Sequence, residues 1–220
     1  VRSRGLGDVY KRQRVSVSLP DGTKVDLNAG SILSYGEDYG RKERGVYLEG
    51  EGFFSVARND KKPFRVRTST IEITALGTAF NVKAYEEEET VQTTLVEGMV
   101  RIADKNNLLE QVYLRPNQMA VYHKQEERIS LNEGDSNERI RQEAKELIKD
   151  SPSVRVSGVD PKPVISWKDE QWLISHEQLG SLAKKLERRY DVTIVFDEES
   201  VNKYAFSGTL KDETLEQVLN

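Results

Sequence analysis

The chain has 220 residues, which is long enough for one or two domains with a buried core. Its 33 Lys+Arg and 37 Asp+Glu give a formal net charge of -4, so no global electrostatic attraction to nucleic acid or to an anionic membrane is expected. The sequence has no cysteine, which excludes disulfides, thiol nucleophiles and thiolate metal sites. The longest apolar run, residues 119–122, is far shorter than the roughly 20 residues of a membrane-spanning helix.

The two ends of the chain differ from the segments beside them. Residues 1–13 are polar, contain several Gly and Arg, and have no hydrophobic period. We expect a non-native or disordered leader there, and a basic arm for nucleic acid is the alternative. At the other end, Leu215, Val218 and Leu219 begin an apolar helical face that stops at Asn220, which suggests a last domain truncated at its C-terminus.

Residues 14–134 have the pattern of an all-β domain. β-Branched and aromatic residues alternate with polar ones in short runs, and turn residues separate the runs. Residues 15–19 and 25–27 alternate around Pro20-Asp21-Gly22, which predicts a hairpin. The further predicted strands are 32–35, 46–49, 53–58, 64–68, 71–76, 80–85, 91–96, 100–103, 108–114 and 118–123. This spacing indicates a β-sandwich or barrel.

Acidic residues in this half have both a structural and a chemical interpretation. Glu49-Gly50 and Glu97-Gly98 each lie between apolar runs, and we favour tight turns or bulges, because Gly tolerates a positive φ. The alternative pairs Glu49 or Glu51 with Glu97 as the acid and base of a glycosidase. The run 86–89 predicts a solvated hairpin tip, since calcium ligands must converge on one ion.

Residues 135–166 are the predicted connector. An apolar stripe predicts a helix over 137–149, which we expect to pack on its own domain. Residues 153–163 contain Gly158, Pro161 and Pro163 and indicate a linker.

Residues 167–220 predict a small second domain with β-α-β order. A strand is expected at 171–174, and Ser175 with Gln178 has the spacing of a capping box that starts a helix ending at Tyr190. A second strand is expected at 192–196, and a second β-α-β copy is expected to begin with a strand over 204–210. The predicted fold class is therefore mainly β plus α+β: a jelly-roll-like β-sandwich followed by a small β-α-β domain.

Few residues in the sequence indicate catalysis or ligand binding. His123 and His176 are the only histidines and fall in different predicted domains, so we assign no catalytic, cofactor-binding or metal-binding residue and expect no enzyme and no cofactor. Trp167 and Trp172 flank the domain junction, where anchoring the junction is favoured over partner contact. The candidate partner-interface residues are Trp167, Trp172, Phe206 and Leu210.

Several motifs in order resemble the FecR family of sigma-factor regulators. They are LPDGT (19–23), LNAGS (27–31), YLEGE (47–51), PFRV (63–66), LGTAFNV (76–82) and LVEG (95–98). The tail FSGTLKDETLE (206–216) is similar to the small C-terminal domain of such proteins, itself similar to the short N-terminal signalling domain of secretins and TonB-dependent transporters. Gly52, where Ala is usual, and the long stretch 135–166 depart from the family pattern.

The resemblance implies the periplasmic domain of an inner-membrane anti-sigma factor that relays a signal without catalysis. The implied partner is the signalling domain of a TonB-dependent outer-membrane receptor. An ECF-type sigma factor would be contacted only through a cytoplasmic segment beyond a membrane helix, neither of which is in this sequence, and no nucleic acid is bound. The alternative is a carbohydrate-binding β-sandwich in which Tyr35, Tyr39 and Tyr47 stack on sugar rings.

Overall fold

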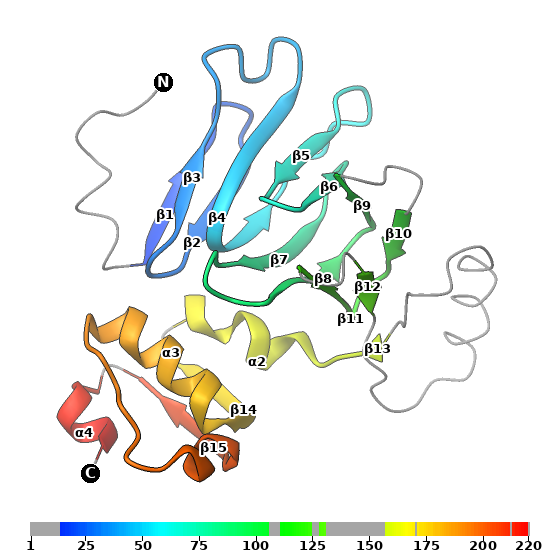
Figure 1. Cartoon of the computed structure of the whole chain (residues 1–220). Helices are drawn as coiled ribbons and strands as arrows, with labels where there is room; N and C mark the ends of the chain where they lie inside the picture. Colours follow the sequence, from blue (N-terminus) through cyan, green and yellow to red (C-terminus); the bar gives the residue numbers. More distant parts are fainter. Residues whose placement is uncertain are drawn as a thin grey trace.

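A computed structural model describes residues 14–105, 111–124, 128–130, 157–169, 171–211 and 213–219. The leader predicted at 1–13 and the connector helix predicted at 137–149 lie outside these residues. Figure 1 shows the strand-rich part above a smaller unit of helices and two strands.

Thirteen described strands form one curled sheet that folds into two layers. They are β1 (Val15–Ser18), β2 (Lys24–Leu27), β3 (Ile32–Ser34), β4 (Arg44–Ser55), β5 (Phe64–Arg67), β6 (Ile71–Ala75), β7 (Ala79–Ala84), β8 (Thr90–Glu97), β9 (Val100–Asp104), β10 (Gln111–Leu114), β11 (Gln118–His123), β12 (Arg128–Ser130) and β13 (Ser157–Gly158). The first layer, sheet A, contains β1, β2, β7, β8, β11, β12 and β13. The second, sheet B, contains β3, β5, β6, β9 and β10.

Strand β4 belongs to both layers. Its first half pairs with β3 and, in parallel, with β5, whereas its second half pairs antiparallel with β2 and β7. Gly50 lies where the pairing changes and has φ +102°. A Cβ at this position would lie 2.6 Å from the Ser31 Cα, so only glycine fits the bend. The Glu49-Gly50 pair is thus a bend within a strand, whereas Gly98, at φ +88°, forms the turn between β8 and β9.

The apolar core lies between the two layers. Phe54 is fully buried, with its ring stacked on Phe80 at 5.3 Å between centroids and 6.0 Å from the ring of Phe64. Alternating burial along the strands produces this core, as in β6, where every second residue is buried. The predicted β-sandwich is confirmed.

The first hairpin forms as its turn residues predict. β1 pairs with β2 around Asp21 and Gly22, and Gly22 has φ +84°. The Asp21 carboxylate accepts hydrogen bonds from the Thr23 backbone N–H at 3.1 Å and from Arg44 Nη1 at 2.9 Å. Burial opposes the charge of Asp21, but the bonds from Thr23 and then Arg44 prevail and lower its pKa.

The segment after β13 contains a helix where the sequence indicated a linker. Helix α2 (Pro161–Ile165) follows directly, and a 3-10 turn, η2 (Ser166–Lys168), continues it. The Asp160 side chain accepts a hydrogen bond from the Lys162 N–H at 3.0 Å, and Pro161 occupies the first helical position, where its missing N–H costs nothing. The prolines therefore start a helix here.

The second unit combines two strands with helices. Its elements are β14 (Trp172–Gln178), α3 (Leu179–Tyr190), η3 (Glu199–Lys203), β15 (Ala205–Leu210) and α4 (Leu215–Leu219). β14 and β15 pair antiparallel in a two-stranded sheet. The small α+β unit and its strand at 205–210 agree with the prediction.

Two local predictions in this unit are wrong. Helix α3 begins after Gln178, not after Ser175, because β14 continues through a bulge between Ile174 and Glu177 to pair with β15. Ser175 is exposed in that bulge, and the helix has no side-chain cap. Residues 192–196 alternate in burial as a strand would, but they form no strand in the described part of the chain.

Candidate functional site

The second unit packs on the outer surface of sheet A through an apolar cluster. Phe53 from β4 lies in one buried cluster with Trp167 and Trp172, both only 5 % exposed. Leu182 and Leu186 of α3 complete the cluster from the other side. The two tryptophans flagged by the sequence are therefore buried within the molecule at the junction.

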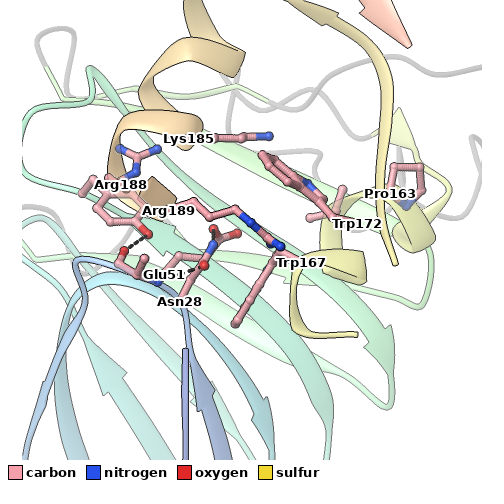
Figure 2. Close-up of a pocket in the computed structure, with 11 residues that line it drawn as sticks. Asn28, Glu51, Pro163, Trp167, Trp172, Lys185, Arg188 and Arg189 are labelled. Atoms are coloured by element: carbon pink, nitrogen blue, oxygen red, sulfur yellow. Dashed lines mark hydrogen bonds between the residues drawn. The ribbon is translucent and has the colours of Figure 1, made fainter. Parts of the chain in front are cut away.

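A polar network on sheet A lies directly under the junction. Glu51 is 5 % exposed, and its two carboxylate oxygens accept hydrogen bonds from Asn28 Nδ2 at 2.8 Å and Asn81 Nδ2 at 2.9 Å. Asn81 in turn accepts a bond from Trp167 Nε1 at 3.3 Å. Figure 2 shows Glu51 and Asn28 facing the tryptophan side of the junction. A buried carboxylate with both oxygens satisfied links the sandwich to the connector.

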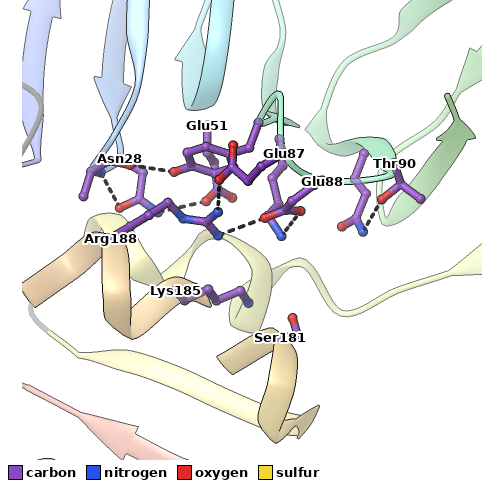
Figure 3. Close-up of polar contacts among 12 residues, drawn as sticks. Asn28, Glu51, Glu87, Glu88, Thr90, Ser181, Lys185 and Arg188 are labelled. Atoms are coloured by element: carbon purple, nitrogen blue, oxygen red, sulfur yellow. Dashed lines mark hydrogen bonds and ion pairs between the residues drawn. The ribbon is translucent and has the colours of Figure 1, made fainter. Parts of the chain in front are cut away.

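Arg188 of α3 joins the second unit to the loop between β7 and β8. Its guanidinium contacts Glu87 Oε1 at 2.8 Å and Glu88 Oε1 at 2.9 Å, and it lies 3.8 Å from the ring centroid of Tyr85. Glu88 also pairs with Lys83 Nζ at 2.6 Å. Figure 3 shows Arg188 extending from the helix toward both glutamates. We call Lys83, Tyr85, Glu87, Glu88 and Arg188 the arginine clamp.

Apart from Glu87, whose side chain is 57 % exposed, the arginine clamp is largely shielded from water. The Lys83, Glu88 and Arg188 side chains are 12 %, 12 % and 14 % exposed. Burial would raise the pKa of Glu88, but Lys83 and then Arg188 outweigh it and hold that pKa below its usual range. Burial opposes the charge of Arg188 too, yet Tyr85 and Glu88 raise its pKa. Glu88 therefore stays ionised between two cations.

The pocket at the junction is too small for a substrate. It is lined by residues of the sandwich, of the connector and of α3, among them Asn28, Glu51, Tyr85, Trp167, Trp172, Lys185, Arg188 and Arg189 (Figure 2). Its volume of about 30 Å³ has room for one or two waters, whereas small-molecule sites are roughly 300–1,000 Å³. The site is thus an interface within the molecule.

The other two candidate partner-interface residues, Phe206 and Leu210, both lie on β15. Phe206 is 45 % exposed, whereas Leu210 is partly buried against the tryptophan cluster. Tyr204 and Val195 are exposed nearby in the sequence, at 67 % and 82 %. Phe206 is accordingly the accessible member of the four.

Several residues of the carbohydrate-binding and glycosidase alternatives have structural roles in the sandwich. Tyr35 and Tyr39 pack against the core with centroids 5.1 Å apart, which leaves only Tyr47 of the proposed sugar-stacking trio exposed. Glu51 has a structural role under the junction, so it is not poised as a glycosidase acid or base. Within the described ranges, no group of three or more acidic or histidine side chains could hold a metal ion.

Sequence reasoning missed the arginine clamp. The run 86–89 is not wholly solvated, because Glu88 is largely covered by a helix 100 residues later. The charged pattern of α3 gives no signal that Arg188 differs from Arg189 beside it. Glu51 was a candidate only for the glycosidase alternative.

Comparison with known proteins identifies the chain. A family model described as FecR protein matches residues 9–101, and one described as FecR, C-terminal, matches residues 172–220. Together the two models match more than half of the chain. The chain belongs to the FecR family.

Solved structures extend this similarity over both units. A crystal structure at 1.65 Å of a candidate anti-sigma factor from Parabacteroides distasonis ATCC 8503 is 29 % identical to this FecR chain, with a TM-score of 0.74. The alignment covers 94 % of this chain and 85 % of that one. A second structure so described, at 2.50 Å, gives 29 % identity and a TM-score of 0.73 over 94 % and 84 %. No curated protein sequence matches significantly.

No helix among the described residues of this FecR chain is long and apolar enough to cross a membrane.

Proposed function

We propose that this FecR chain is the periplasmic signalling part of a membrane-anchored anti-sigma regulator. It receives a signal from a TonB-dependent outer-membrane receptor and relays it toward an ECF-type sigma factor, which is contacted through a cytoplasmic segment. The observation that carries this proposal is the match of both FecR models, in order, together with a solved anti-sigma candidate that aligns over 94 % of the chain.

The geometry supports relay rather than catalysis. A partner that binds the second unit at Phe206 would act on a body held to the sandwich by the arginine clamp and by Trp167. Coupling requires that the partner bind two arrangements of these units with different affinity. Buried charges and packed rings at the junction favour one defined arrangement, and partner binding would shift the chain to a second one.

The receptor contact is assigned to the exposed side of β15. Phe206 and Tyr204 are aromatic side chains of the kind that dominate binding energy in interfaces, and Leu210 continues this strand toward the junction. A docked strand or loop at β15 would therefore lie one strand away from Trp172, the register partner of Leu210.

The test is titration calorimetry with the periplasmic signalling domain of the TonB-dependent receptor encoded beside this gene. We expect a dissociation constant of about 1 µM, a free energy near -8 kcal/mol, as suits a reversible regulatory contact. Phe206→Glu should weaken binding at least tenfold, whereas Tyr47→Glu, an exposed aromatic of the sandwich, should not.

Two results would overturn the proposal. One is the absence of heat and of NMR shift changes at about millimolar receptor domain. The other is binding of an oligosaccharide in its place, which would favour the carbohydrate-binding alternative.

A further inference from the structure

The two outer surfaces of the sandwich differ in what covers them. The outer surface of sheet A carries Phe53 and Glu51, which the connector and second unit bury. Five of the eight exposed large hydrophobic side chains in the described part of the chain belong to the sandwich, and all five lie on or directly beside strands of sheet B. These are Ile32, Tyr47, Leu76, Met99 and Tyr113, which we call the open face.

Strand register brings three of these side chains around one arginine. Leu76 and Met99 adjoin the paired residues Ala75 and Val100, which point into the core, so alternation turns Leu76 and Met99 outward. In the next outward row, Arg101 is the register partner of Tyr113 on one side and of Thr74 on the other. Met99 precedes Arg101 by two residues and shares its face.

Several charged side chains on this face are paired with one another. Arg65 and Arg67 contact Glu43 at 3.2 and 2.7 Å, and Arg67 also contacts Glu72 at 2.9 Å. Arg101 instead donates to Thr74 Oγ1 at 3.2 Å and Gln111 Oε1 at 3.4 Å, and within the described residues it has no carboxylate partner. Among the described residues, a guanidinium without a carboxylate partner thus lies between exposed apolar side chains.

We propose that the open face is a second docking surface, which binds a protein partner that places a carboxylate on Arg101 and apolar side chains on Leu76, Met99 and Tyr113. This surface is distinct from the β15 contact assigned to the receptor. Arginine and tyrosine with an apolar surround are the composition of interface centres. The face spans six strands, about 24 Å, which suits a small, reversible contact.

The arrangement fits a protein better than a sugar. Tyr113 and Tyr47 lie four strand spacings apart, roughly 19 Å, so they cannot stack on neighbouring rings of a short oligosaccharide. Lys105 Nζ lies over the Tyr47 ring, 5.5 Å from its centroid. Leu76 and Met99, between the two aromatics, are aliphatic and favour apolar side chains as partners.

The test uses the purified chain and defined peptides. ¹⁵N NMR shifts are followed during titration with an eight-residue peptide of alternating leucine and glutamate, and with a matched peptide of leucine and lysine. We expect the acidic peptide to shift the amides of residues 74–76, 99–101 and 113, and the basic peptide to bind at least fivefold more weakly. Arg101→Glu should reverse this preference, whereas Lys24→Glu, the same charge change on sheet A, should leave it unchanged.

The remaining outcomes would overturn the proposal. Equal binding of the two peptides, or shifts elsewhere, would remove the role of Arg101. Shifts at Tyr47 and Tyr113 with maltohexaose, and none with the peptides, would make the face a sugar site. Concentration-dependent dimerisation in sedimentation that Met99→Glu abolishes would assign the face to a second copy. Circular dichroism and a melting curve establish that each variant is folded.

Discussion

Individual residues decide how the second unit is held on the sandwich. Arg188 satisfies Glu87 and Glu88 and also covers the ring of Tyr85, so one side chain supplies two ion pairs and a cation–π contact. Glu88 and Arg188 are largely shielded from water, and removing the arginine leaves the Glu88 carboxylate with Lys83 as its remaining partner in the described structure. Breaking a shielded pair costs more than an exposed pair contributes.

Arg188→Met should lower the free energy of unfolding by about 2 kcal/mol, because methionine keeps the packing but leaves a half-compensated carboxylate. Urea unfolding measures the change. Lys184→Met is the matched control on the exposed side of the same helix and should change stability by less than about 0.5 kcal/mol. Equal effects of the two substitutions would contradict the clamp.

Glu88 should make the free energy of unfolding depend on pH. Its pKa in the folded protein lies below the ordinary 4.5, because Lys83 and Arg188 outweigh the effect of burial, so its contribution is present above about pH 4.5. The contribution is lost as the pH falls through the folded-state pKa. Glu88→Gln should therefore reduce the loss of stability between neutral pH and about pH 3, whereas Glu86→Gln, at an exposed position, should not. Parallel pH profiles of the wild type and Glu88→Gln would refute this role.

At the scale of elements, β4 is the strand on which the sandwich depends. It pairs with four other strands and passes from sheet B to sheet A at Gly50. The bend also orients Glu51: the Glu51 N–H donates to Ser31 Oγ at 2.8 Å, and its carboxylate lies under the junction. The conformation of Gly50 therefore places Glu51 of the sandwich under the junction with the second unit.

Gly50→Ala should destabilise the protein by about 3 kcal/mol or more, because the positive φ is unfavourable for alanine and the new Cβ would overlap Ser31. Gly40→Ala is the control, since Gly40 has φ +77° but a Cβ added there would meet no atom within 4 Å. It should cost only about 1 kcal/mol. Thermal and urea unfolding compare the two variants, and similar losses would argue against the close approach of β4 and Ser31.

At the scale of the whole molecule, the two outer surfaces of one sandwich serve different purposes. Sheet A is covered by the connector and second unit through Phe53, Trp167 and Trp172, whereas sheet B retains the open face. Interfaces between units of one chain allow relative motion unless they are apolar and well packed. Because of the tryptophan cluster and the arginine clamp, we expect the two units to unfold together.

Trp167→Ala should make the two units unfold separately. Removing this buried ring and its bond to Asn81 should cost about 3–5 kcal/mol, and calorimetric unfolding should change from one transition to two. Tyr204→Ala, at a 67 % exposed aromatic, should keep a single transition near the wild-type midpoint. A single cooperative transition in both variants would show that Trp167 does not couple the units.

The sequence alone determined the local and compositional features of this FecR protein. Alternation predicted most strands of the sandwich, because burial on one face of a pleated strand requires a period of two. Pro20-Asp21-Gly22 predicted the first hairpin, because its turn chemistry is contained in three adjacent residues. The ordered motifs from residue 19 to residue 98 were enough to recognise the family.

The tertiary structure decided what depends on distant residues. Pairing with β15 extended β14 past Ser175, so a favourable local cap was overridden. Glu88 differs from its neighbours in being covered by α3 and paired with both Lys83 and Arg188, the latter 100 residues away, and nothing in a run of four glutamates marks the one that a helix will cover. Pairing between distant segments leaves no local period in a sequence, and the junction consists of such pairings.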